Sequence, residues 1–243
     1  MRFEGSHVVV TGGTRGIGAA VTLAFLGEGA HVHATYRGDE AAAERLRGEA
    51  GDASERLFTH KVDVTDAEAV AAFWAGLEET PVSVLVNNAG IRRDALLPLM
   101  GEEDWSAVLE TNLSGSYRMA HHAVKNMLGQ RYGRIVFVTS PAAKVGFEGQ
   151  GNYAASKAGQ VGLARAMCKE VARKKITVNC VSPGFIETDL IADLPDETAK
   201  GYRSSVPMRR FGKPEEVASA VLYLASPEAS YINGATLEVT GGL

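Results

Sequence analysis

The chain has 243 residues, of which 45% are hydrophobic and 22% charged, a composition of folded globular domains that excludes a disordered chain. Its net charge of −4 offers no basic face for nucleic acid, and no apolar run approaches the roughly 18 residues that cross a membrane. Two cysteines, six histidines without metal-ligand spacing and an N-terminus unlike a signal peptide lead us to expect a cytoplasmic protein without a disulfide framework or a metal site.

Short β-branched runs alternate with longer helical patterns along the whole chain. In chain order we expect a strand at 7–11, a helix at 16–28, a strand at 32–35, a helix at 39–49, a strand at 57–61, a helix at 66–78, a strand at 82–86, a helix at 103–128, a strand at 135–139, a helix at 152–173, a strand at 176–181, a helix at 214–224 and a strand at 236–239. Such alternation is typical of βαβ units, which build a parallel sheet with helices on both faces. The sequence therefore predicts one doubly wound α/β domain of the Rossmann type over residues 1–243, with about seven strands. The irregular stretch 182–213 is expected to form a lid or a binding element.

A glycine-rich turn separates the first expected strand from the first expected helix. Its glycines let the backbone come close to a pyrophosphate, and the helix N-terminus offers free N–H groups and a positive dipole. The spacing G-x-x-x-G-x-G differs from the usual G-x-G-x-x-G, and a plain turn is the alternative. We predict a dinucleotide-binding turn formed by Gly12, Thr14, Arg15, Gly16, Ile17 and Gly18.

The end of the second expected strand selects the cofactor. An NAD-dependent enzyme places a carboxylate there to bind the ribose 2′-hydroxyl, whereas this chain has Tyr36 followed by Arg37. Arg15 can approach the same place, and two guanidinium groups suit a 2′-phosphate. We therefore expect NADP(H), with a merely solvated Arg37 as the alternative.

Two further segments follow strands and are expected at the same edge of the sheet. Asp63, with Val64 beside it, could accept a hydrogen bond from the adenine amino group, or it could cap the next helix. Asn88, Ala89 and Gly90 follow the fourth strand and supply small and amide residues where ligands bind doubly wound sheets.

The residues expected to carry chemistry lie in the second half of the chain. Tyr153 and Lys157 are four residues apart, which places them one turn apart on one face of a helix. The lysine ammonium should lower the pKa of the tyrosine and make it a usable acid. Ser140 ends the fifth expected strand, where its hydroxyl could donate to a substrate carbonyl. Asn112 is an asparagine inside a predicted helix, an unfavourable place that suggests a specific role.

Together these motifs resemble the short-chain dehydrogenase/reductase family over the whole chain. The resemblance implies that Tyr153 protonates a carbonyl oxygen as hydride arrives, that Ser140 polarises the carbonyl, and that Asn112 holds a water in a proton relay through Lys157. Lys157 would also hold the nicotinamide ribose, and Tyr153 would lie against the cofactor. It further implies nicotinamide contacts from Pro183, Gly184, Ile186 and Thr188.

Within the family, the chain is most similar to the 3-oxoacyl-[acyl-carrier-protein] reductases of fatty acid synthesis. The similarity rests on the segments 152–159, 176–179, 182–189 and 209–218. It implies a homotetramer built on the helices at 103–128 and 152–173, and a substrate carried by acyl carrier protein. Other carbonyl reductases, acting on acetoacetyl-CoA, a polyketide intermediate or a free ketone, share much of the pattern. A non-catalytic dinucleotide sensor is the alternative from another class.

Two basic residues close turns at the opposite edge of the sheet. Arg131 follows the long predicted helix, and Lys174 follows the next one. Basic residues at helix C-termini commonly complement the helix dipole. The resemblance offers a second interpretation, in which Arg131 and Lys174 dock the acidic carrier protein at a neighbouring subunit.

Overall fold

The structure is a computed structural model that describes residues 1–188 and 196–243. Its centre is a parallel seven-stranded sheet with the strand order β3-β2-β1-β4-β5-β6-β7. The strands are β1 (His7–Val10), β2 (His31–Tyr36), β3 (Leu57–Lys61), β4 (Val82–Asn87), β5 (Gly133–Val138), β6 (Ile176–Pro183) and β7 (Thr236–Val239). The predicted doubly wound fold is confirmed, and each strand end lies within two residues of its predicted position.

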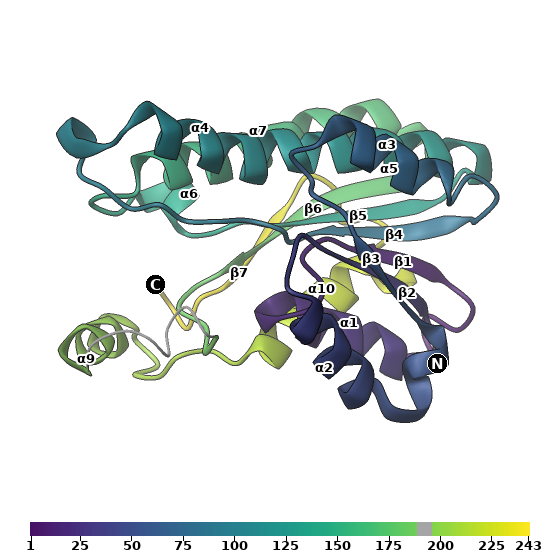
Figure 1. The fold of residues 1–243 in the computed structure, drawn as a ribbon, viewed down its shortest axis with the longest axis horizontal. Coiled ribbons are helices and arrows are strands. Elements are labelled where there is room, and N and C mark those ends of the chain that lie inside the picture. Colours follow the sequence, from purple (N-terminus) through teal and green to yellow (C-terminus); the bar gives the residue numbers. More distant parts are fainter. Residues whose placement is uncertain (189–195) are drawn as a thin grey trace.

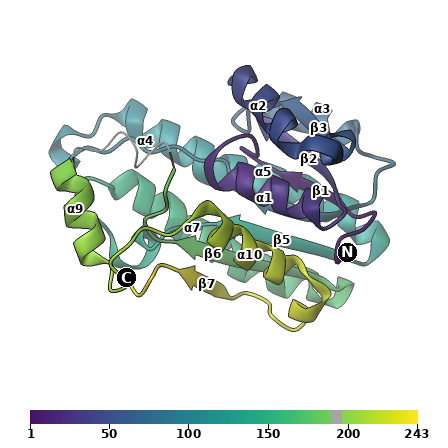
Figure 2. The same cartoon turned by 90° about the horizontal axis from the view of Figure 1, so that it is seen from below.

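Helices cover both faces of the sheet (Figure 1). They are α1 (Gly16–Gly27), α2 (Glu40–Ala50), α3 (Ala67–Ala75), α4 (Glu102–Leu109), α5 (Gly115–Gln130), α6 (Ala142–Val145), α7 (Gly151–Val171), α9 (Asp196–Ser205) and α10 (Pro214–Ala225). In Figure 1 the layer with α3, α4, α5 and α7 lies above the sheet, and α1, α2 and α10 lie below it. Figure 2 looks onto the lower layer and shows α9 set apart, near the C-terminus.

Each face of the sheet carries its own apolar core. Below the sheet, Phe25 of α1 and Val221 of α10 are fully buried against strand residues such as Val8. Above it, Met119 of α5 and Phe137 of β5 belong to the second cluster. Because the central strands are buried on both faces, they are continuous hydrophobic runs in the sequence rather than alternating ones. This explains why the strands were predictable.

The strand order reverses between β1 and β4. In doubly wound sheets, ligands bind at the carboxyl ends of the strands at such a switch point. The glycine turn after β1 and the Asn88–Gly90 segment after β4 therefore meet at the place where a cofactor is expected.

The predicted helix at 103–128 is divided in the structure. A π-helical turn over Glu110–Ser114 separates α4 from α5 and contains the buried Asn112. Such turns are rare and frequently occur at functional sites. The stretch 182–213 is not irregular throughout, since it contains α9, while its residues 189–195 lie outside those that the structure describes.

Candidate active site

A cavity of about 670 Å³ lies at the carboxyl edge of the sheet, around the switch point. Thirteen of the residues predicted to bind the dinucleotide line it, namely Gly12, Thr14, Arg15, Gly16, Ile17, Tyr36, Arg37, Asp63, Val64, Asn88, Ala89, Gly90 and Thr188. The cavity is also lined by residues that sequence reasoning missed, among them Thr35, Gly38, Asp39 and Ile91. These residues lie within two positions of predicted residues in the sequence. Only the structure shows that they too line the cavity.

The glycine turn has the geometry that close approach to a phosphate requires. Gly12 and Gly16 have positive φ angles of 59° and 53°, a region that favours glycine. A Cβ on Gly18 would lie 2.0 Å from the Gly12 carbonyl oxygen, so only glycine fits below the turn. Gly18 thus allows the first turn of α1 to pack against the Gly12 backbone, and it does not line the cavity. Asn88 donates to the carbonyls of Thr11 and Gly12 at 3.1 and 3.0 Å and joins the β1 and β4 loops.

Two arginine side chains line the cavity. Arg15 and Arg37 are both exposed, and their guanidinium groups make no hydrogen bond or ion pair among the described residues. The carboxylate of Asp39 also lines the cavity, but one of its oxygens accepts from the Ala42 N–H at 2.9 Å and caps α2. Two unpaired guanidinium groups fit the extra phosphate of NADP(H).

Asp63 is partly engaged within its own loop. Its Oδ1 accepts hydrogen bonds from the backbone N–H and the hydroxyl of Thr65, at 2.9 and 2.8 Å. The cap of α3 is provided by Asp66 instead, so Asp63 is not a helix cap. Its second carboxylate oxygen makes no hydrogen bond to any residue that the structure describes.

The predicted chemical residues come together beside Gly90, which lines the cavity, but Asn112, Ser140, Tyr153 and Lys157 do not line it themselves. A Cβ on Gly90 would lie 3.2 Å from Asn112 Oδ1 and 3.7 Å from Lys157 Nζ. The Lys157 ammonium is buried, donates to the Val138 carbonyl at 2.8 Å and lies 5.6 Å from the centre of the Tyr153 ring. The Ser140 hydroxyl accepts from the Ala142 N–H at 3.2 Å and lies close enough to Tyr153 to lower its pKa. Pro141 does not keep Ser140 away from Tyr153, although it follows Ser140 directly.

The prediction that Lys157 lowers the pKa of Tyr153 is wrong, because the pKa of Tyr153 is raised. Burial raises the pKa of Tyr153, and the effects that oppose this rise come from Ser140 and the charge of Arg92. Burial also lowers the pKa of Lys157 to about 8. Four-residue spacing correctly places the two side chains near each other, but it does not report how deeply both are desolvated.

Asn112 connects three segments of the site. Its Oδ1 accepts from the Ile91 N–H at 2.8 Å, and its Nδ2 donates to the Ile91 carbonyl at 3.0 Å and to Ser156 Oγ at 3.1 Å. Its own carbonyl accepts from Gln160 Nε2 at 2.7 Å. The side chain thus fixes the loop after β4 to α7. Its place in a predicted helix indicated a specific role, but not these partners.

The expected nicotinamide contacts divide into two groups. Thr188 lines the cavity close to Gly16, where an added Cβ would lie 3.4 Å from Thr188 Cγ2. Pro183, Gly184 and Ile186 do not line it. A Cβ on Gly184 would lie 2.9 Å from Thr240 Cα, so this glycine allows the chain to leave β6 close to the end of β7.

Arg131 and Lys174 lie at the opposite edge of the sheet, where β5 and β6 begin. Arg131 ends α5 in a left-handed conformation with φ 55°, and Lys174 lies in the short 3-10 turn that follows α7. Within the described ranges, no helix is long and apolar enough to span a membrane, and no three His, Cys, Asp or Glu side chains are grouped as metal ligands would be.

Comparison with known proteins agrees with this geometry. Residues 12–243 match the family model described as Enoyl-(Acyl carrier protein) reductase. Over its full length the chain is 43% identical to the 3-oxoacyl-[acyl-carrier-protein] reductase FabG of Vibrio harveyi and 42% identical to FabG of Escherichia coli K12, covering 99% of each. It is 40% identical to the 3-oxoacyl-[acyl-carrier-protein] reductase MabA of Mycobacterium bovis, over 99% of this chain and 94% of that protein.

The sheet, its switch-point cavity and the Tyr–Lys pair define a dinucleotide-binding protein of the doubly wound class. More narrowly, the chain belongs to the short-chain dehydrogenase/reductase family.

Proposed function

We propose that this chain is an oxidoreductase that uses NADPH to reduce a 3-oxoacyl thioester on acyl carrier protein to the 3-hydroxyacyl thioester in fatty acid biosynthesis. The observation that carries the proposal is the grouping of Ser140, Tyr153 and Lys157 next to Gly90, a residue that lines the cavity. Full-length similarity to several 3-oxoacyl-[acyl-carrier-protein] reductases supports the substrate class.

In this proposal, the nicotinamide of bound NADPH supplies the hydride. Tyr153 donates its phenolic proton to the substrate oxygen, and its raised pKa keeps that proton in place at neutral pH. Ser140, which lies close enough to Tyr153 to act on its pKa, donates to the same carbonyl oxygen. Lys157, whose ammonium already holds the Val138 carbonyl, would bind the nicotinamide ribose.

Arg15 and Arg37 support NADP(H) over NAD(H), because they place in the cavity wall two cations that pair with no side chain among the described residues. Replacing Arg37 with Asp removes one charge-assisted contact and adds repulsion, which should cost about tenfold to a hundredfold in kcat/KM with NADPH. Arg209→Asp, an arginine outside the cavity, is a matched control. Equal kcat/KM for NADPH and NADH in the unmodified enzyme would contradict the preference.

We also propose that the chain forms a homotetramer in the cytoplasm and that acyl carrier protein delivers the substrate. This chain has a net charge of −4, so an acidic carrier protein would need a local basic surface to dock on it. The exposed Arg131 and the half-exposed Lys174 can provide such basic groups. Changing both to Glu should raise KM for a carrier-protein substrate, most strongly at low salt, and leave a small ester substrate unaffected. An equal effect on both substrates would indicate an assembly defect.

A substrate panel tests the reaction itself. NADPH oxidation is followed by absorbance with 3-oxoacyl groups on carrier protein, on coenzyme A and as simple esters, and with a free ketone. We expect the highest kcat/KM on carrier protein and a loss of at least about 100-fold in Tyr153→Phe, with NADPH binding retained. Activity only on coenzyme A thioesters, polyketide intermediates or free ketones would assign a different carbonyl reductase. NADPH binding without any turnover would favour a dinucleotide sensor.

A further inference from the structure

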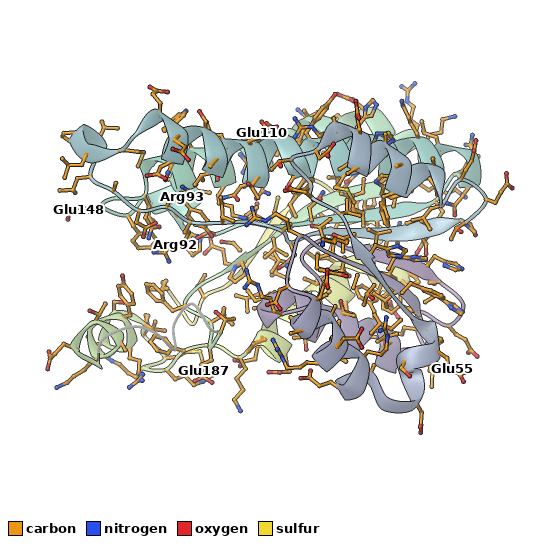
Figure 3. The ribbon with its side chains drawn as sticks, in the orientation of Figure 1. Glu55, Arg92, Arg93, Glu110, Glu148 and Glu187 are labelled. Atoms are coloured by element: carbon orange, nitrogen blue, oxygen red, sulfur yellow. The ribbon has the colours of Figure 1, made fainter. Side chains whose placement is uncertain are left out.

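Arg92 lies beside Tyr153 and was not among the predicted site residues. It lies on the loop after β4, next to the cavity residue Ile91. Its guanidinium carbon is 5.9 Å from the centre of the Tyr153 ring, and Tyr202 of α9 lies near enough to help raise the pKa of Arg92. In Figure 3, Arg92 is on the side of this loop that faces α9, whereas Arg93 is on the other side and pairs with Asp104. Arg92 therefore lies between the catalytic tyrosine and α9.

The loop that carries Arg92 is held from both sides by backbone contacts. Asn112 makes two hydrogen bonds to the backbone of Ile91, at 2.8 and 3.0 Å, and the Ala95 N–H donates to the Gly149 carbonyl at 2.9 Å. Asn152, the neighbour of Tyr153, donates to the Arg93 carbonyl at 2.9 Å. None of these contacts uses the Arg92 side chain. Its loss should leave the loop in place.

Arg92 has hydrogen-bond donors to spare. Its Nε and Nη2 donate to Asp94, which is also bound by Gln150 Nε2 at 3.2 Å. A guanidinium has five N–H groups, and Nη1 of Arg92 makes no hydrogen bond to any described residue. The side chain is 30% exposed, so a substrate can reach it.

The charge balance decides which kind of group Arg92 can accept. Asp94 offsets most of the arginine charge and would repel a second carboxylate. Directional N–H donors beside a nearly neutral ion pair suit a neutral acceptor, such as a carbonyl oxygen. A 3-oxoacyl thioester carries a second carbonyl, at C1, which a single carbon, C2, separates from the ketone carbon whose oxygen Tyr153 protonates.

We propose that Arg92 is a specificity-determining residue that donates a hydrogen bond to the C1 carbonyl oxygen of the substrate while Tyr153 serves the C3 oxygen. The inference rests on the proposed 3-oxoacyl reduction and adds a second point of recognition to it. Arg92 selects 1,3-dicarbonyl substrates over ketones that lack the C1 carbonyl or hold it at another distance. The two side chains lie on different elements, so both carbonyls are fixed only when the loop after β4 and α7 are correctly placed.

The test compares ethyl 3-oxobutanoate with ethyl 4-oxopentanoate and 2-hexanone as probes, with NADPH, in the wild type and in Arg92→Gln and Arg92→Lys. In Arg92→Gln, kcat/KM for the 3-oxo ester should fall about tenfold or more relative to the two other ketones. Arg92→Lys keeps the positive charge near Tyr153 but loses the planar donor set. Turnover of 2-hexanone should therefore stay near the wild-type value in Arg92→Lys, while the preference for the 3-oxo ester is reduced. Arg93→Gln, on the opposite side of the loop, is the matched control and should keep the preference.

The outcomes separate this inference from the proposed function. An equal loss on all three probes in both variants, or an unchanged 3-oxo preference, overturns the role of Arg92 and leaves 3-oxoacyl reduction intact. A wild-type enzyme that reduces no 3-oxo ester or thioester overturns both. Circular dichroism and NADPH affinity, measured in the same variants, show whether a loss comes from misfolding or from damage to the cofactor site.

Discussion

Four histidines lie close together on three neighbouring strands of the sheet. They are His7 on β1, His31 and His33 on β2, and His60 on β3. His33 is at the centre, with its ring nitrogens 3.3 Å from His7 Nδ1 and 3.1 Å from His60 Nε2. Burial and the neighbouring histidines lower the pKa of His33 to about 4, and burial also lowers the pKa of His7 and His60. The cluster should therefore make folding stability sensitive to mild acid.

The sign and size follow from proton linkage. His33 is neutral in the folded protein down to about pH 4, whereas in the unfolded chain it takes up a proton below about 6.5. The unfolded state therefore binds more protons between these values, and stability falls as the pH falls. The gap between 6.5 and about 4 corresponds to about 3 kcal/mol in full, of which about 2 kcal/mol is lost by pH 5.

Urea unfolding at pH 7.5 and pH 5.0, at one protein concentration, measures this loss. In the wild type the ring centres of His33 and Phe58 are 4.9 Å apart. The variant His33→Phe keeps an aromatic ring at this place and removes the central titrating group. We expect the wild type to lose at least about 2 kcal/mol and the variant to lose markedly less. His121→Phe on α5 controls for removing a histidine outside the cluster. Equal pH dependence in the wild type and His33→Phe would refute the assignment to His33.

Two further predictions concern the frame of the site. Gly18→Ala should raise the Kd for NADPH more than about tenfold in a fluorescence titration, because its Cβ would meet the Gly12 carbonyl at 2.0 Å. Gly48→Ala, whose Cβ would meet nothing within 4 Å in α2, should instead leave binding unchanged and stabilise the fold by about 0.5–1 kcal/mol. Asn112→Ala should lower the free energy of unfolding by about 2 kcal/mol, measured in urea, because the Ile91 N–H and carbonyl lose their partner. An unchanged unfolding midpoint would mean that this connection between segments contributes little.

The parts of the fold that local physics decides were predictable from the sequence. Parallel strands buried on both faces are continuous apolar runs, and all seven were predicted within two residues of their ends. The π-helical turn at Glu110–Ser114 was not predictable, since its residues continue the surrounding helical pattern. Helix α9 was also missed. The stretch 182–213 contains three prolines, which predicted an irregular segment, whereas the structure has the polar helix Asp196–Ser205 there.

The residues of the site also divide into those that the sequence predicted and those that only the fold brings together. The glycine turn, Arg37 and the Tyr153–Lys157 pair were recognised because spacing and strand ends place them at one edge of the sheet. Arg92 was missed because its contact with Tyr153 joins residues 61 positions apart, through a loop whose course only the fold determines. Contacts of this kind leave no periodic signal in a single sequence.

The raised pKa of Tyr153 favours one direction of the proposed reaction. Reduction needs the protonated phenol as an acid, whereas oxidation of a 3-hydroxyacyl substrate needs the phenolate as a base. Burial disfavours the phenolate, and Lys157, which donates to the Val138 carbonyl, does not reverse this effect. Reduction should therefore stay near its maximum around pH 7, while oxidation should still be rising with pH above that point. Measuring kcat against pH in both directions checks this, and an oxidation rate already maximal at pH 7 would mean that the base is not Tyr153.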